Sequence, residues 1–218
     1  MAFAAGALVF PGGRIDREDH AAAAQLAPHL PDAPARIAAI RETIEETGIA
    51  PALSPAADRA TAEALRQAIA AGEPFATALH RLGFTLDLEA LTPFARWCPN
   101  FREARRFDAL FYLAEAPAGG AEASADQNEA VSAFWASAAS ILADVQAGRA
   151  QAIFPTRRNL ERLARFASID EARADAAAHP VRQITPWIEE RDGRRYLCIP
   201  EDAGYPITAE LFESVRRG

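Results

Sequence analysis

Arg41-Glu42-Thr43-Ile44-Glu45-Glu46-Thr47-Gly48-Ile49 carries the strongest signal in this sequence. With about 100° of rotation per residue, a helix through it places Glu42, Glu45 and Glu46 on one side. The opposite side is apolar and carries Ile37, Ile40 and Ile44. Like charges three and four positions apart repel each other, so this crowding does not stabilise a helix. Because hard cations such as Mg²⁺ and Mn²⁺ prefer carboxylate oxygens, the stretch predicts a helix that binds divalent cations.

Both ends of this helix are marked in the sequence, which predicts a helix over 35–47. Asp32 is suited to accept from the free N–H groups of the first turn, and Pro34 fits that turn. Gly48 stands where a left-handed residue would end the helix. Upstream, the apolar run 7–10 predicts a strand over 8–10, followed by a turn at Gly12-Gly13 where the backbone can approach a ligand closely.

Gly13, Arg41-Glu42, Glu45-Glu46 and Gly48-Ile49 together resemble the box of the Nudix hydrolases, G-x5-E-x7-R-E-U-x-E-E-x-G-U, with U a bulky apolar residue. The second half matches at every charged and glycine position, and Thr43 occupies the first U. The first half departs, because Arg41 follows Gly13 by 28 positions instead of 14 and the early acid is Asp19 instead of Glu. We interpret residues 20–33 as an insertion that forms a short helix and a loop.

A long insertion at this place is similar to one branch of the family, the peroxisomal-type acyl-coenzyme A diphosphatases and their bacterial relatives. Later segments resemble that branch more loosely: Phe94-Ala95-Arg96-Trp97 with Arg105-Arg106-Phe107-Asp108, Glu129 before Trp135, and Phe154-Pro155-Thr156 with Leu160 and Leu163. The resemblance implies coenzyme A or an acyl-coenzyme A as substrate. The products would be 4′-phosphopantetheine, or its acyl form, and adenosine 3′,5′-bisphosphate.

The expected fold is of the α/β (α+β) class, a Nudix-like α/β/α sandwich with a mixed sheet in a single domain over 1–218. Helical periodicity over 57–71 and 74–82 predicts a helical insert at 55–83, and Asp192-Gly193 predicts a hairpin at 184–200. Further strands are expected at 92–97, 107–114 and 130–135, and further helices at 137–147 and 157–167.

Family members usually have two strands before the Phe-Pro-Gly-Gly turn, whereas Met1 lies only nine residues before Phe10. Either the start is misplaced or the sheet lacks those strands; an uncovered edge would invite a second chain, so a homodimer stays open.

Composition limits the classes of function. The chain has 218 residues, half of them apolar, and a net charge of −7 with no basic run, which argues against nucleic acid as a partner. The two cysteines, Cys98 and Cys198, are too few for a disulfide framework and fit no zinc site. No run of 18 apolar residues exists, so no membrane span is expected. We therefore expect a soluble cytoplasmic protein that acts on a small nucleotide diphosphate.

Each candidate residue has a chemical role in this interpretation. Glu45 and Glu46 are the chosen ligands of Mg²⁺ or Mn²⁺, Glu42 is a ligand or the catalytic base, and the Gly13 carbonyl completes the coordination. Arg41 lies four residues before Glu45 and is expected to orient carboxylates by bidentate pairing. Glu129 is a further ligand or the base by analogy of position, with an exposed loop carboxylate as the alternative.

Other candidates are weaker. Asp19 supports the ligands from behind or caps the inserted helix. Arg105 and Arg106, with Arg102, bind substrate phosphates or are exposed surface. The tryptophans could stack on an adenine, but packing in or beside the core is favoured for Trp97, Trp135 and Trp187. The four histidines pair with no Cys or acid at ligand spacing and are assigned no chemistry.

Two classes of function remain. The preferred one is an enzyme that uses Mg²⁺ or Mn²⁺ to hydrolyse a nucleoside diphosphate linked to another moiety, with ADP-ribose or NADH as alternative substrates. The other is a Nudix-type module that senses a nucleotide without cleaving it, for which the absent early Glu and front strands leave room. The intact trio of glutamates favours the enzyme, because a pure binder has no need to keep them crowded together.

Overall fold

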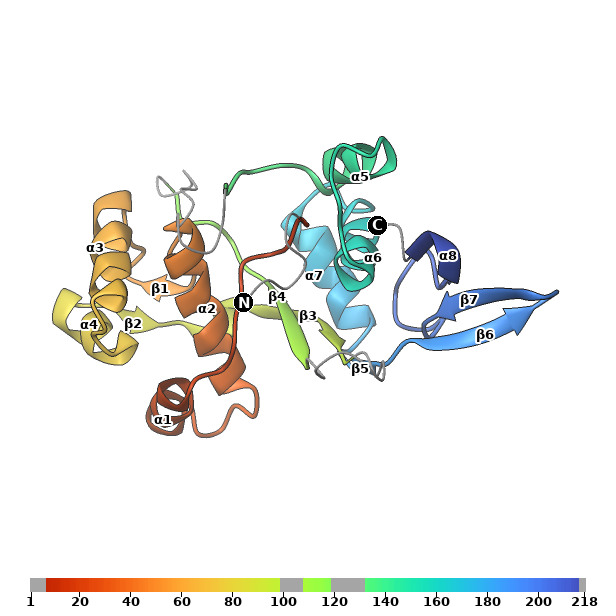
Figure 1. Cartoon of the computed structure of the whole chain (residues 1–218). Coiled ribbons are helices and arrows are strands. Elements are labelled where there is room, and N and C mark those ends of the chain that lie inside the picture. Colours follow the sequence, from red (N-terminus) through yellow and green to blue (C-terminus); the bar gives the residue numbers. More distant parts are fainter. Residues whose placement is uncertain (1–6, 99–107, 119–131, 216–218) are drawn as a thin grey trace. The chain divides into compact units, whose positions relative to one another are not determined.

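The computed structural model describes residues 7–98, 108–118 and 132–215 of the chain (Figure 1). The chain divides into two compact units. The helical unit comprises residues 11–92 and 114–135, and the sheet unit comprises residues 1–10, 93–113 and 136–218. The expectation of a single domain stays a prediction. Within the described part of the chain, no helix is long and apolar enough to cross a membrane.

The helical unit is built from two pairs of helices. Helix α1 (Arg17–Leu26) packs on α2 (Ala33–Thr47), and α3 (Arg59–Ala70) packs on both α2 and α4 (Phe75–Leu82). Two short antiparallel strands, β1 (Leu53–Ser54) and β2 (Thr85–Leu86), pair Leu53 with Leu86, and a 3₁₀ turn follows at Leu88–Ala90. The helices expected at 35–47, 57–71 and 74–82 are therefore confirmed to within two residues at each end.

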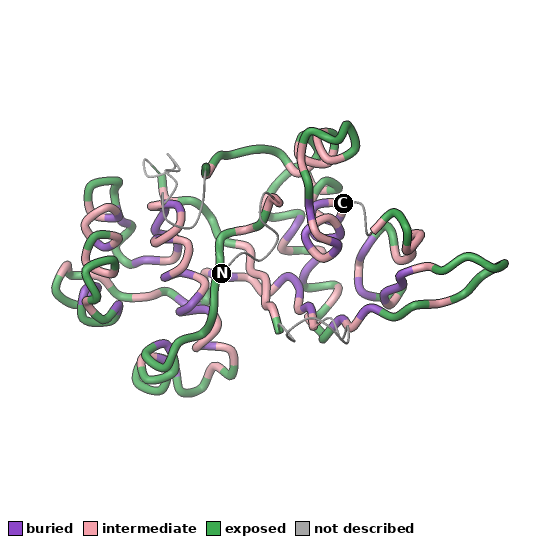
Figure 2. The backbone as a smooth tube through the Cα atoms, in the orientation of Figure 1, coloured by how far each residue is buried: buried purple, intermediate pink, exposed green. Residues whose placement is uncertain are grey.

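Helix α2 has the two faces that the sequence predicts. Ile37, Ile40 and Ile44 are at most 1 % exposed, whereas Glu42, Glu45 and Glu46 are of intermediate exposure. In Figure 2 the helix accordingly alternates between buried and intermediate positions. Gly48 ends the helix in the left-handed conformation at φ 69°, as expected. A buried arginine joins α2 to the 3₁₀ turn: Arg36 Nη1 donates to the carbonyls of Leu88 and Leu91 at 2.7 and 2.6 Å.

The predicted cap of α2 by Asp32 is wrong. The Asp32 carboxylate makes no capping hydrogen bond to the first turn, and instead pairs with Arg36 Nε at 2.9 Å. The backbone at Asp32 (φ −100°, ψ 14°) lies outside the extended region from which a capping side chain reaches back. The Asp32 carboxylate therefore forms an ion pair with the buried Arg36 instead of accepting from the N–H groups of the first turn.

The sheet unit contains two three-stranded sheets. In the first, β3 (Thr92–Trp97) lies between β4 (Ala109–Leu113) and β5 (Gln183–Ile184), and β5 runs parallel to β3. In the second, β6 (Trp187–Arg191), β7 (Arg194–Cys198) and β8 (Ala209–Leu211) are antiparallel. Asp192 and Gly193, both at positive φ, form the tight turn between β6 and β7. Gln183 and Ile184 belong to the first sheet, so the hairpin begins at Trp187.

The described part of the sheet unit also contains the helices α5 (Ala138–Gln146), α6 (Phe154–Leu163), α7 (Ile169–Ala178) and the short α8 (Phe212–Val215). Trp97, 1 % exposed, lies in the core with its indole N–H donating to Asn159 and Tyr205. Trp135 and Trp187 are 61 % and 44 % exposed, so packing in the core holds only for Trp97. Helix α7 was not anticipated, because its alanine-rich sequence gives a weak periodic signal.

Two expected strands are not formed. Around Leu8 there is only an isolated parallel bridge to Ala152, because residues 8–10 find no strand partner to extend it. Residues 132–135 belong to no strand, and residues 130–131 lie outside the described part. Cys98 and Cys198 are free thiols, as expected, and Cys198 is buried.

Candidate functional site

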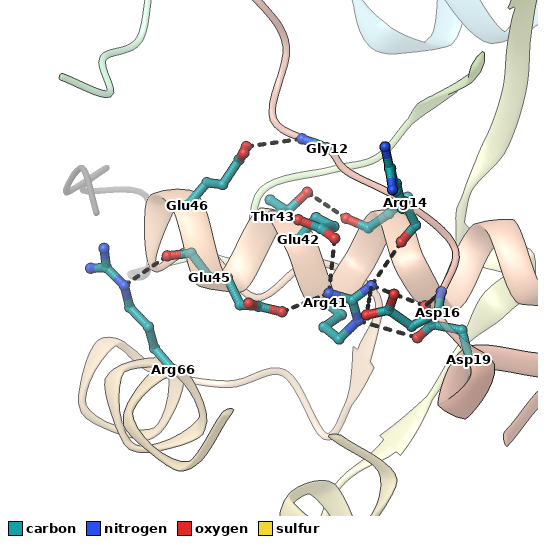
Figure 3. Close-up of polar contacts among 11 residues, drawn as sticks. Gly12, Arg14, Asp16, Asp19, Arg41, Glu42, Thr43, Glu45, Glu46 and Arg66 are labelled. Carbon is teal, nitrogen blue, oxygen red and sulfur yellow. Dashed lines mark hydrogen bonds and ion pairs between the residues drawn. The ribbon is translucent and has the colours of Figure 1, made fainter. Parts of the chain in front are cut away.

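Arg41 lies at the centre of a cluster of carboxylates on α1 and α2, which we call the α2 cluster: Asp16, Asp19, Arg41, Glu42, Glu45 and Glu46 (Figure 3). Nη1 of Arg41 donates to Glu42 at 2.9 Å and to Glu45 at 2.8 Å. Nη2 donates to the carbonyl of Arg14 at 3.0 Å. A single nitrogen of the guanidinium thus bridges two of the three predicted metal-binding carboxylates. The expected bidentate pairing is not made with either of them, and the orienting role of Arg41 stays a prediction.

Asp19 occupies the most buried position in the cluster, at 2 % exposed. It accepts from Arg41 Nε at 3.2 Å and from Nη2 at 3.0 Å. Its carboxylate also accepts from the backbone N–H of Asp16 at 2.8 Å, at the start of α1. Asp19 therefore caps the start of α1 and pairs with Arg41, while its predicted support of the metal ligands stays a prediction.

The same contacts explain how the long insertion leaves the site intact. Helix α1 begins at Arg17, before the predicted insertion at 20–33, because Asp16 and Asp19 stabilise its first turn. That start brings Asp19 back to Arg41 across 22 positions of sequence. The extra residues therefore lengthen the connection between α1 and α2 without displacing the acid that faces the arginine.

The glycine turn lies directly against the glutamates. The N–H of Gly12 donates to Glu46 Oε2 at 2.9 Å (Figure 3). A Cβ atom added at Gly13 would lie 2.3 Å from the carboxylate of Glu42, so a side chain at this position would displace that carboxylate. The two glycines were predicted to let the backbone approach a ligand closely. In the structure, the groups that lie close to this backbone are the carboxylates of Glu42 and Glu46.

The electrostatics of the cluster show an excess of negative charge. Burial raises the pKa of Glu42 to about 7, and the neighbouring charges of Glu45 and Glu46 add to this while Arg41 opposes it. Burial alone lowers the pKa of Arg41, but hydrogen bonds to Asp19 and Glu45 outweigh it and raise that pKa above its usual range. One cation thus faces more carboxylates than it can neutralise.

This donor set fits a hard divalent cation in chemistry, because the oxygens are carboxylates and a nearby backbone carbonyl, and their charge is not balanced. Within the ranges that the structure describes, however, no three His, Cys, Asp or Glu side chains converge on a common point. Arg41 lies between Glu42 and Glu45, and Glu46 is turned toward Gly12. The roles of Glu42, Glu45, Glu46 and Gly13 in metal binding stay predictions.

Three predicted site residues, Arg105, Arg106 and Glu129, lie outside the described residues. A contact that the sequence did not predict comes from α3, where Nε of Arg66 donates to the backbone carbonyl of Glu45 at 2.9 Å. A signal for it does exist in the sequence, because the last turn of α2 carries Glu45 and Glu46 and no basic residue of its own. Cations are favoured at that end of a helix.

Comparison with known proteins supports the Nudix resemblance through structure. No model of a known protein family matches the chain, and no curated protein matches it by sequence. The crystal structure of a Nudix hydrolase from Alicyclobacillus acidocaldarius is similar, with a TM-score of 0.65 and 25 % sequence identity. The match covers 80 % of this chain and 83 % of that chain. The predicted α+β Nudix-like fold is therefore confirmed, whereas the acyl-coenzyme A branch is not.

Proposed function

We propose that this chain, as a Nudix pyrophosphohydrolase, cleaves the diphosphate of coenzyme A or an acyl-coenzyme A. Water adds across the P–O–P linkage: one P–O bond forms, one breaks, and each phosphorus leaves in a phosphomonoester. The products are 4′-phosphopantetheine, or its acyl form, and adenosine 3′,5′-bisphosphate. Hydrolysis of a nucleotide diphosphate is supported by the similarity to a Nudix hydrolase, whereas coenzyme A as the substrate rests on the sequence resemblance.

The α2 cluster at the glycine turn is the observation that carries this proposal. Glu42 lies against Gly13 and Glu46 accepts from Gly12, so the carboxylates and the turn form one surface. Surface helices do not gain stability from like charges at this spacing. The arrangement is explained if a divalent cation and an anionic substrate bind there.

In the mechanism we propose, Glu45 and Glu46 hold Mg²⁺ or Mn²⁺, with the Gly13 carbonyl and Glu42 as further donors. The bound cation supplies neutralisation of phosphate charge and a more acidic water. Arg41 fixes the directions of Glu42 and Glu45 through Nη1, and Asp19 fixes Arg41 in turn. Glu42 is either a ligand or the base that takes a proton from water. Glu129 as a further ligand, and Arg105 and Arg106 as phosphate contacts, stay predictions.

The test is a substrate panel. The chain is incubated with coenzyme A, an acyl-coenzyme A, ADP-ribose and NADH, each with Mg²⁺ or Mn²⁺, and the products are separated by chromatography. We expect adenosine 3′,5′-bisphosphate from the coenzyme A substrates, with a higher kcat/KM than for the others. A Glu45→Gln variant purified in parallel controls for contaminating phosphatases. Faster cleavage of ADP-ribose or NADH would contradict the substrate while leaving the reaction class intact.

A nucleotide-sensing module is the alternative, for which Asp19 at the position of the early Glu leaves room. The same panel separates the two functions. Binding of a nucleotide, measured by calorimetry, with no product from any substrate would support the sensor. A cytoplasmic location and a homodimer stay predictions that this panel does not address.

A further inference from the structure

We propose that Arg66, on helix α3, is a positioning residue for the metal-binding turn of α2. This inference rests on the proposed function, since it concerns the carboxylates assigned to the cation. Arg66 belongs to the helical insert and not to the box, and the contact that it makes is to backbone (Figure 3). It acts on Glu45 and Glu46 by fixing the helical turn from which they project.

The carbonyl of Glu45 needs a partner that α2 itself does not supply. In a continuing helix that carbonyl would accept from the N–H of Ile49. The helix instead ends at Gly48, whose N–H donates to Ile44 at 2.9 Å, and the N–H of Ile49 donates to Thr47 Oγ1 at 3.2 Å. Arg66 Nε donates to the Glu45 carbonyl at 2.9 Å. A side chain from another helix thus replaces the lost helical hydrogen bond.

The charge of Arg66 also matters at this position. The C-terminal end of a helix carries partial negative charge, and acidic side chains there are unfavourable. The last turn of α2 holds Glu45 and Glu46 and no basic residue. The negative charges of Glu45 and Glu46 therefore destabilise the last turn of α2, although this turn has to keep both side chains in position for the cation. Arg66 supplies the cation that α2 lacks, from a side chain only 16 % exposed.

The packing of α3 fixes where this guanidinium lies. Leu65, the residue before Arg66, is fully buried, and Ala62 is 2 % exposed, so one face of α3 is held in the core of the helical unit. Nη1 of Arg66 also lies 3.8 Å from Oε2 of Glu63, on the same helix. The arginine is therefore supported on both sides, which suits a residue that orders a neighbouring turn.

The test compares Arg66→Gln with Arg66→Lys and with a matched control, Arg81→Gln. Arg81 is in the same insert but is 53 % exposed and pairs with Glu73, far along the sequence from the glutamates of α2. The first readout is hydrogen exchange of the backbone amides over 44–49 without metal. The second is Mn²⁺ affinity, measured from the free-ion signal in electron paramagnetic resonance, which needs no substrate and no turnover.

We expect Arg66→Gln to speed exchange in this turn at least several-fold and to weaken Mn²⁺ binding about 10-fold, within the range for residues that support metal ligands. Arg66→Lys should recover part of both, because it keeps the charge and loses the planar fork. Arg81→Gln should match the parent. Faster exchange with unchanged Mn²⁺ affinity would overturn the proposal, because Arg66 would then be structural only, and so would unchanged exchange. A parent chain that binds no Mn²⁺ would overturn the metal site itself, and this inference with it.

Discussion

Two clusters of arginines and carboxylates among the described residues, one in each unit, differ in charge balance. In the α2 cluster, Arg41 alone pairs with four carboxylates, those of Asp16, Asp19, Glu42 and Glu45. The α6 cluster consists of Arg157, Arg158, Glu161, Arg162, Asp175 and Glu210, with three cations and three anions. The first is left with negative charge, and the second is neutral.

The surroundings of the two clusters differ as well. In the α6 cluster, Arg158 and Arg162 are at most 2 % exposed, and Arg162 lies over the ring of Phe94 with its guanidinium carbon 4.1 Å from the centroid. Arg162 Nη1 also donates to the Phe94 carbonyl at 2.8 Å. Balanced, desolvated pairs of this kind stabilise a fold. The unbalanced and partly exposed α2 cluster has the charge that our proposal requires of a cation site.

The largest effect is expected for the metal ligands. Glu45→Gln or Glu46→Gln should lower kcat by about 10² to 10⁴-fold, comparable to the loss of a catalytic proton-transfer group. The fold should survive, because both side chains are partly exposed, and circular dichroism checks this. Glu89→Gln, at an exposed glutamate of the 3₁₀ turn, is the matched control and should retain full activity. Parent-like turnover in either ligand variant would remove the assignment.

For the α6 cluster we expect a loss of stability, in contrast to the loss of activity expected for the metal ligands. Arg162→Met should lower the free energy of unfolding by about 3–5 kcal/mol, because it leaves the largely buried Asp175 without its arginine partner. Urea denaturation measures this change. The pair Arg149–Asp144, with Arg149 64 % exposed, gives the control: Arg149→Ala should cost less than about 1 kcal/mol. Equal effects of the two substitutions would show that burial does not matter for these pairs.

Metal binding should stabilise the parent chain and distinguish the two clusters. With free Mn²⁺ at 100 times its dissociation constant, linkage predicts a gain of about 2.7 kcal/mol in the free energy of unfolding. The gain should vanish in a variant carrying both Glu45→Gln and Glu46→Gln, and should persist in Arg162→Met. Urea denaturation with and without Mn²⁺ tests this. A gain that survives the double substitution would place the cation elsewhere.

A smaller effect is expected at Asp19. Asp19→Asn should lower the free energy of unfolding by about 1–3 kcal/mol, because the buried Arg41 loses its most buried compensating charge and the amide presents N–H groups to a donor. Glu18→Gln on the same turn is exposed and should change stability by less than about 0.5 kcal/mol. Chemical denaturation of both variants tests whether the pair between Asp19 and Arg41 stabilises the chain, and equal stability would show that it does not.

The sequence predicts best those features that are local. The two faces of α2, its end at Gly48 and the turn at Asp192-Gly193 follow from periodicity and from glycine at positions that need positive φ. The strand expected at 8–10 depends on partners far along the chain, which periodicity does not contain. In the same way, the loss of the Asp32 cap to Arg36 is a competition that only the folded chain decides.

The candidate site shows the same division. The box predicts the trio of glutamates and Arg41, because these residues recur at helical spacing. It does not predict that α1 returns Asp19 to Arg41, or that Arg66 reaches the Glu45 carbonyl from another helix, 21 positions away. These contacts depend on packing between helices. The sequence therefore predicts which residues bind a cation, and the structure shows which side chains contact those residues.

The most direct test is a crystal of the chain soaked in Mn²⁺, with the ion located from its anomalous scattering. We predict one or more peaks within about 2.0–2.4 Å of carboxylate oxygens of Glu45 and Glu46, as hard-cation coordination requires. Peaks elsewhere, with Glu45 still bound to Arg41 and Glu46 to Gly12, would contradict the assignment of the α2 cluster as the metal centre.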